Sequence, residues 1–130
     1  MRYTKLEGKN RMEDLKLFDG EYKFICIIWE MEPVNSTELF RACEKRLGWK
    51  KSTTYTMLRK LSARGLLQNE NATVTTLVKR EQVQKYESQA LVGKAFDGSL
   101  PAFVAAYLKD RRLTEKEVLE IMRMIKEATE

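Results

Sequence analysis

The stretch KKSTTYTMLRKLSARG, residues 50–65, decides how the rest of the chain can be organised. At about 3.6 residues per turn, four of its residues recur at the spacing of one narrow helix face: Thr54, Met57, Leu58 and Leu61. Gly65 follows where a helix commonly ends in a left-handed residue. The pattern predicts a short helix with one face in a core.

The opposite side of this predicted helix carries hydroxyl groups near its N-terminus and cations further along. Hydroxyl groups reach base edges and phosphates in a DNA major groove, and Arg and Lys neutralise the DNA backbone. The alternative is that this side of the helix is only solvated. Thr is a weak helix former, however, and is a poor choice for a helix face that is only solvated. The predicted DNA-binding residues are Lys50, Lys51, Ser52, Thr53, Tyr55, Thr56, Arg59 and Lys60. We expect base or base-proximal contacts from Thr53, Tyr55 and Thr56, and mainly phosphate contacts from Lys50, Lys51, Arg59 and Lys60.

The charge of the chain is unevenly distributed. Its 24 Lys and Arg exceed its 19 Asp and Glu, which gives a net charge of +5. Residues 41–64 contain eight cations and one anion, Glu44, and eight minus one leaves +7. Residues 81–130 contain eight cations and nine anions, which leaves −1. A basic block beside a balanced half is typical of a protein with a polyanionic partner.

The composition argues against several other classes. There is no His, and the two cysteines, Cys26 and Cys43, form no Cys-x-x-Cys pair, so we expect no metal and no cofactor. No nucleophile and base pair is recognisable, so an enzyme is not expected. Residues 1–17 lack the apolar region of a secretory signal, and the longest apolar run, 24–29, is far shorter than a membrane span. These features predict a cytoplasmic protein that does not insert into a membrane.

The N-terminal half is predicted to be a flexible arm, 1–17, and one domain, 18–80. Asp19 is the expected N-cap of a helix over 20–31, and Asn35 with Glu38 forms a capping box for a helix that ends at Leu47. After Gly65 the apolar period changes from 3.6 to 2, and residues 69–73 supply a turn. Three helices and a two-stranded hairpin predict a winged helix-turn-helix.

The C-terminal half, 81–130, is predicted to be a three-helix dimerisation domain. It is small, yet its helices have wide apolar arcs, so it needs a partner, most simply a second copy of the chain. The alternative is that these helices fold back on the N-terminal domain. The predicted dimer interface consists of Leu100, Phe103, Tyr107, Val118, Ile121, Met122 and Ile125. The fold class is thus mainly α with a small β wing.

In their order and spacing, these elements resemble the penicillinase-repressor family, which includes BlaI, MecI and the copper-responsive CopY branch. The resemblance covers about residues 18–127. It rests on matches at 21–22, 27–29, 35–39, Trp49, Thr53, 56–58, Leu61, 65–66 and 96–100. It implies a homodimeric repressor that binds a palindromic operator in double-stranded DNA and dimerises through its C-terminal helices. In the β-lactam branch, a membrane sensor protease relieves repression by cutting an Asn-Phe bond after the Gly-Ser turn, and the aligned bond here joins Ala106 and Tyr107.

Departures from the family pattern limit the transfer. Lys50-Lys51 replaces a common Ser-Pro, and the segment 72–74 lacks the usual glycine and basic residue of the wing tip. The C-terminus has no cysteine-rich metal hook, and Asn is missing from the aligned cleavage bond. A winged helix used only for protein contacts, without sequence-specific DNA binding, is therefore the alternative function.

Overall fold

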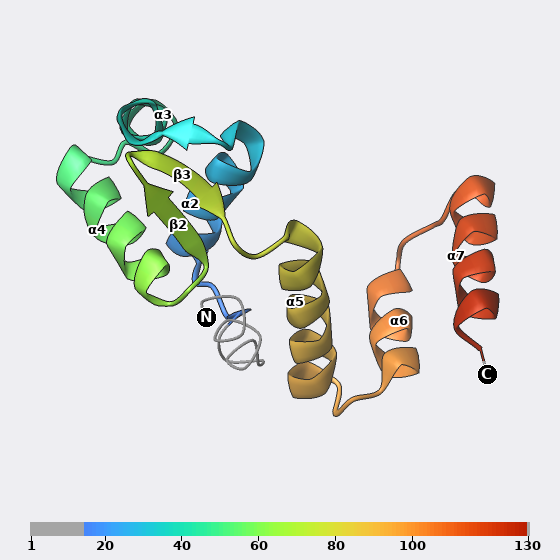
Figure 1. Ribbon diagram of the computed structural model, residues 1–130. Helices are drawn as coiled ribbons and strands as arrows, with labels where there is room; N and C mark the ends of the chain where they lie inside the picture. The colour runs from blue at the N-terminus through green and yellow to red at the C-terminus, as the bar shows by residue number, and fades with distance from the viewer. Residues whose placement is uncertain (1–14, 130) are drawn as a thin grey trace. The chain divides into compact units, whose positions relative to one another are not determined.

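The computed structural model describes residues 15–129 (Figure 1). Residues 1–14 of the expected N-terminal arm lie outside the described residues. The contacts within the chain divide it into two compact units, Met1–Ala90 and Leu91–Glu130. Each unit is described by itself below.

Before the start of α5 (Arg80–Ala95), the described residues of the first unit form three helices and a small antiparallel sheet, as the sequence predicts. Its elements in chain order are α2 (Asp19–Met31), β1 (Val34–Asn35), α3 (Ser36–Leu47), α4 (Lys51–Ala63), β2 (Leu67–Glu70) and β3 (Thr73–Thr76). The hairpin of β2 and β3 is the expected wing, with Leu67 opposite Thr76 and Glu70 opposite Thr73.

The sheet has three strands, in the order β1-β3-β2, where the sequence analysis expected two. Val34, in the short segment between α2 and α3, pairs with Val74 of β3. A strand of two residues has no periodicity to detect, so only the tertiary pairing reveals it.

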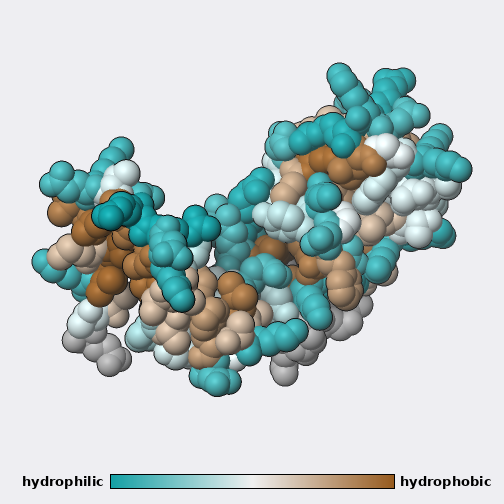
Figure 2. Space-filling view, turned by 180° about the vertical axis from the view of Figure 1, so that it is seen from behind, coloured by the Kyte–Doolittle hydropathy of each residue, from teal (hydrophilic) through white to brown (hydrophobic). Residues whose placement is uncertain are grey.

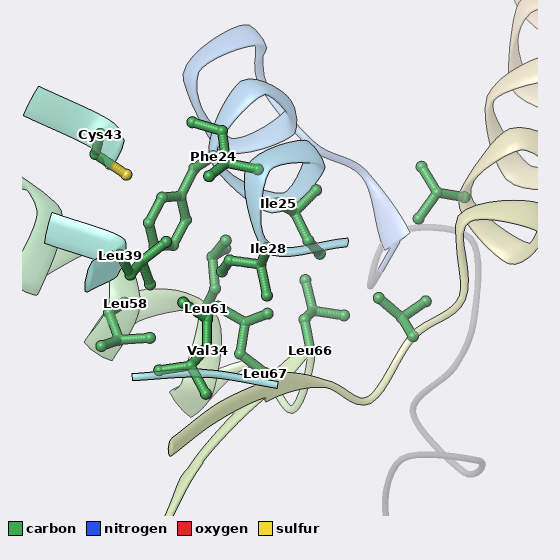
Figure 3. Close-up of a cluster of buried hydrophobic side chains, with 14 of the residues drawn as sticks. Phe24, Ile25, Ile28, Val34, Leu39, Cys43, Leu58, Leu61, Leu66 and Leu67 are labelled. Carbon is green, nitrogen blue, oxygen red and sulfur yellow. The ribbon is translucent and has the colours of Figure 1, made fainter. Parts of the chain in front are cut away.

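The core of this unit lies between the three helices and the sheet (Figure 3). Figure 3 shows Phe24, Ile25 and Ile28 of α2 pointing toward side chains from α3, α4 and the strands. Cys43 is fully buried there, and burial raises the pKa of its thiol, an effect that a hydrogen bond with Thr54 only partly offsets. Cys43 is therefore a core residue.

The helix ends follow the expected chemistry with two corrections. The N-cap of α2 is Phe18 and not Asp19, because the Phe18 N–H donates to Oε1 of Glu21 at 2.8 Å. Asn35 caps α3 as predicted, but its side chain accepts from the Thr37 N–H at 2.8 Å and does not form the predicted capping box with Glu38. Gly65, just beyond α4, has the expected positive φ of 82°.

The C-terminal helices are α5 (Arg80–Ala95), α6 (Leu100–Leu108) and α7 (Glu115–Ala128). The sequence predicts a domain boundary between residues 80 and 81, whereas the contacts divide the chain after Ala90. The reason is that α5 begins in the first unit, where Val83 is buried and Tyr86 packs against the core. None of the described helices is long and apolar enough to cross a membrane.

Candidate nucleic-acid interface

Helix α4 divides into the two faces that its sequence predicts. Thr54, Leu58 and Leu61 are buried, and Met57 is half-buried against the core. All eight predicted DNA-binding residues are exposed: Lys50, Lys51, Ser52, Thr53, Tyr55, Thr56, Arg59 and Lys60. The structure thus brings them together on the solvent side of one helix. Whether each contacts DNA stays a prediction.

The three exposed cations of α4 have different partners. The Lys51 ammonium lies 5.6 Å from the centre of the Phe40 ring on α3. The Arg59 guanidinium lies 5.0 Å from the centre of the Tyr55 ring, one helical turn earlier. The Lys60 ammonium lies 2.9 Å from a carboxylate oxygen of Glu21 on α2. These residues therefore differ in how freely they could move to a DNA phosphate.

Glu21 is a buried carboxylate that sequence reasoning missed. Its side chain is only 3% exposed, and Arg64 lies 3.5 Å from Oε1 while Lys60 lies against Oε2. Burial alone would raise the pKa of Glu21, but the Phe18 N–H, Lys60 and Arg64 together lower it below its ordinary value of 4.5. Glu21 therefore stays ionised and ties the start of α2 to the end of α4. Nothing local in the sequence signals this, since both cations belong to another helix.

The wing carries no cation between Leu67 and Thr76. Its turn consists of Asn71 and Ala72, both with positive φ, 53° and 65°. This is the backbone of a tight two-residue hairpin turn, in which the second position ordinarily favours glycine. The Ala72 carbonyl accepts from the Ser36 N–H at 2.8 Å, so the turn also contacts the first residue of α3.

The unit formed by residues 91–130 exposes most of its apolar side chains. Figure 2 shows hydrophobic residues gathered over the C-terminal helices, and no residue of α6 or α7 is buried. Six of the seven predicted interface residues are exposed, and Phe103 is half-buried between the rings of Phe96 and Tyr107, at 5.5 and 6.0 Å. The six are Leu100, Tyr107, Val118, Ile121, Met122 and Ile125.

The aligned cleavage bond, Ala106–Tyr107, lies in the last turn of α6, and both of its residues are exposed. The Tyr107 ring carries the Arg111 guanidinium 5.0 Å from its centre. Within the described residues, no group of three or more His, Cys, Asp or Glu could hold a metal ion.

Three helices, of which α4 has one exposed face, and a β-hairpin define the class of winged-helix proteins. The model of the penicillinase repressor family matches residues 19–127, and the chain belongs to this family. A penicillinase repressor from Bacillus licheniformis is 22% identical over 116 residues, which cover 86% of this chain and 91% of that protein. The family consists of DNA-binding transcriptional repressors and not of enzymes, and it is the family that the sequence motifs indicated.

Proposed function

We propose that the protein acts as a homodimer that binds a palindromic operator and places α4 of each copy in a major groove. The observation that carries this proposal is the exposure of all eight hydroxyl, aromatic and cationic residues on the free side of α4. The local charge of +7 over residues 41–64 provides the attraction to phosphate. Operator binding requires that the protein and the DNA share a compartment, so the proposal includes the predicted cytoplasmic location.

The C-terminal helices support the homodimer. A helix such as α7, with Val118, Ile121, Met122 and Ile125 exposed on one face, is marginal in water without a partner. A second copy related by a two-fold axis would cover this face and α6 together. Such a dimer would present two α4 helices to half-sites about 34–36 Å apart.

In vitro selection tests this proposal. The purified full-length protein would be used to select from a duplex library with a randomised core. We expect an enriched inverted repeat whose half-sites are one helical turn apart. Enrichment of a single, unrepeated site would contradict the dimeric mode, and no enrichment at all would contradict sequence-specific binding.

We further propose, from the family resemblance, that a membrane sensor protease relieves repression by cutting α6 between Ala106 and Tyr107. Separating two linked half-site domains would lower operator affinity by a factor on the order of 10² or more without altering a DNA contact. Ala106 offers no side-chain amide to a protease that selects Asn, so cleavage here would be slow. Mass spectrometry of the repressor after incubation with membranes that carry the cognate sensor tests this. An intact chain that nonetheless releases DNA would contradict it and indicate an effector ligand or a partner protein.

A protein-interaction module remains the second candidate because of the wing. This hairpin has no cation, and its acidic Glu70 accepts from Gln68 at 2.6 Å. Such a wing gives no electrostatic attraction to phosphate. The two functions differ in salt dependence, because only DNA binding releases condensed counterions from phosphate.

A further inference from the structure

The pair formed by Tyr55 and Arg59 places a guanidinium on the ring of a neighbour in the same helix, whereas Lys51 is an ammonium near Phe40 of α3. The Arg59 guanidinium lies over the Tyr55 ring, 5.0 Å from its centre, and has no carboxylate partner among the described residues. Lys60, the next residue, is bound by Glu21 at 2.9 Å. Arg59 is therefore a cation that is held in place by an aromatic face and still presents its N–H groups to solvent.

Stacking on Tyr55 also places the charge of Arg59 closer to the N-terminus of α4. Side chains of a helix lean toward its N-terminus, and Tyr55 lies one turn before Arg59. The guanidinium thereby lies over Tyr55 in the N-terminal half of α4, on the side of the helix that the periodicity also assigns to Ser52 and Thr56. This is the half of a recognition helix that contacts base edges, whereas residues further along contact backbone.

The fixed orientation of the group and its place on the helix together favour a base over a phosphate. A guanidinium also binds pairs of phosphate oxygens, but a phosphate contact requires no fixed orientation, and a mobile lysine supplies one as well. A planar guanidinium in a fixed orientation matches the two acceptors of guanine, O6 and N7, in the major groove. Stacking on Tyr55 restricts the side chain before binding, so less conformational freedom is lost when those two hydrogen bonds form.

We infer that Arg59, oriented by Tyr55, reads a guanine in each operator half-site. This revises the expectation that Arg59 mainly contacts phosphate. The inference rests on the proposed DNA binding through α4 and extends it by naming a base and the residue pair that selects it. Tyr55 is the positioning residue and Arg59 the group that touches the base.

The experiment compares site preferences selected from the randomised duplex library for the full-length wild type and four variants. Arg59→Gln removes the cation, and Tyr55→Leu removes the ring while keeping an apolar side chain. Tyr55→Phe keeps the ring and removes only the hydroxyl. Lys50→Gln is the matched control, an exposed cation at the N-cap of α4 with no aromatic ring beneath it among the described residues. All of these residues are exposed, and thermal unfolding verifies that each variant folds.

We expect the wild type to enrich a guanine in each half-site. Arg59→Gln and Tyr55→Leu should both lose that one preference, with about 5- to 150-fold weaker binding to the selected duplex. Tyr55→Phe should keep the guanine preference. Lys50→Gln should weaken binding to all duplexes and leave the guanine preference unchanged. Replacing the guanine by 7-deazaguanine, which lacks the N7 acceptor, should weaken wild-type binding and leave Arg59→Gln unaffected.

Two results would overturn the inference. If Arg59→Gln lowers affinity equally for all duplexes, as Lys50→Gln should, then Arg59 is a phosphate contact. If Tyr55→Leu keeps the guanine preference, then the stack does not orient Arg59. A wild type that enriches no sequence would instead contradict the proposed function itself, and the two failures are thus distinguishable.

Discussion

The ammonium of Lys60 on α4 lies 2.9 Å from the buried carboxylate of Glu21 on α2. Oε2 of Glu21 makes no other hydrogen bond among the described residues. Lys60 therefore stabilises the position of the recognition helix relative to α2, in addition to any contact that it makes with DNA.

Replacing Lys60 by Met should lower the stability of the first unit. The substitution keeps the length and helix propensity of the side chain but leaves a buried carboxylate oxygen without its partner, at a cost of about 1–3 kcal/mol. Arg64 remains beside Oε1, and Lys60 itself is 55% exposed, so a larger loss is not expected. Urea unfolding measures the free energy. Lys23→Met, at an exposed site on α2, is the control, and equal stability of the two variants would contradict this role for Lys60.

Glu21 should also make stability depend on acid pH. Its pKa in the folded protein is below the ordinary value of 4.5, so ionised Glu21 contributes stability that is fully present above the unfolded pKa. That contribution is lost as the pH falls below 4.5 and through the folded pKa. Unfolding midpoints measured down this range should fall more steeply for the wild type than for Glu21→Gln. The control is Glu30→Gln, which removes an exposed carboxylate paired with Arg46. Parallel curves for the wild type and Glu21→Gln would contradict the prediction.

Replacing Ala72 by Gly should stabilise the wing. Ala72 has a φ of 65°, where an L-residue incurs a cost of about 1–2 kcal/mol that glycine avoids. The greater freedom of glycine in the unfolded chain offsets part of this gain, so the net increase should be about 0.5–1 kcal/mol. Thermal unfolding measures the change. Ala42→Gly, inside α3, should instead destabilise by about 1 kcal/mol or more, and a loss of stability in Ala72→Gly would show that the turn is not strained.

A polar substitution on α7 should dissociate the proposed dimer. Ile121 is 41% exposed within a single chain, on the apolar face with Val118 and Ile125. Ile121→Gln should shift the protein toward monomer at micromolar concentration and weaken operator binding by roughly 10²-fold. Glu120→Gln, on the polar side of the same helix, should change neither. Sedimentation gives the oligomeric state, and a monomeric wild type would refute the dimer outright.

The division of α4 into two faces was predictable because a 3.6-residue period is a local property. Thr54, Leu58 and Leu61 lie in the core, and the predicted DNA-binding residues lie outside it. The turn of the wing was predictable from its polar residues for the same reason. These features depend on neighbours in the sequence and need no knowledge of the tertiary fold.

Other features were not predictable from a periodic pattern, and two of them depend on distant partners. Val34 becomes a strand only by pairing with Val74. Glu21 is buried only because α4 brings Lys60 and Arg64 to it. The N-cap of α2 moves to Phe18 because Glu21 reaches back to its N–H. The position of the Arg59 side chain on the Tyr55 ring depends on side-chain rotamers, which the 3.6-residue helix period does not specify.

The central claim is sequence-specific DNA binding through α4, and equilibrium titration tests it most directly. Fluorescence anisotropy would give the Kd of the wild type for the selected duplex and for a shuffled duplex of the same composition, from about 50 to 200 mM salt. The account predicts that the selected duplex binds at least about 10³-fold more tightly at physiological salt, and that both affinities fall steeply as salt rises. Equal affinity for the two duplexes, or binding that is insensitive to salt, would contradict it.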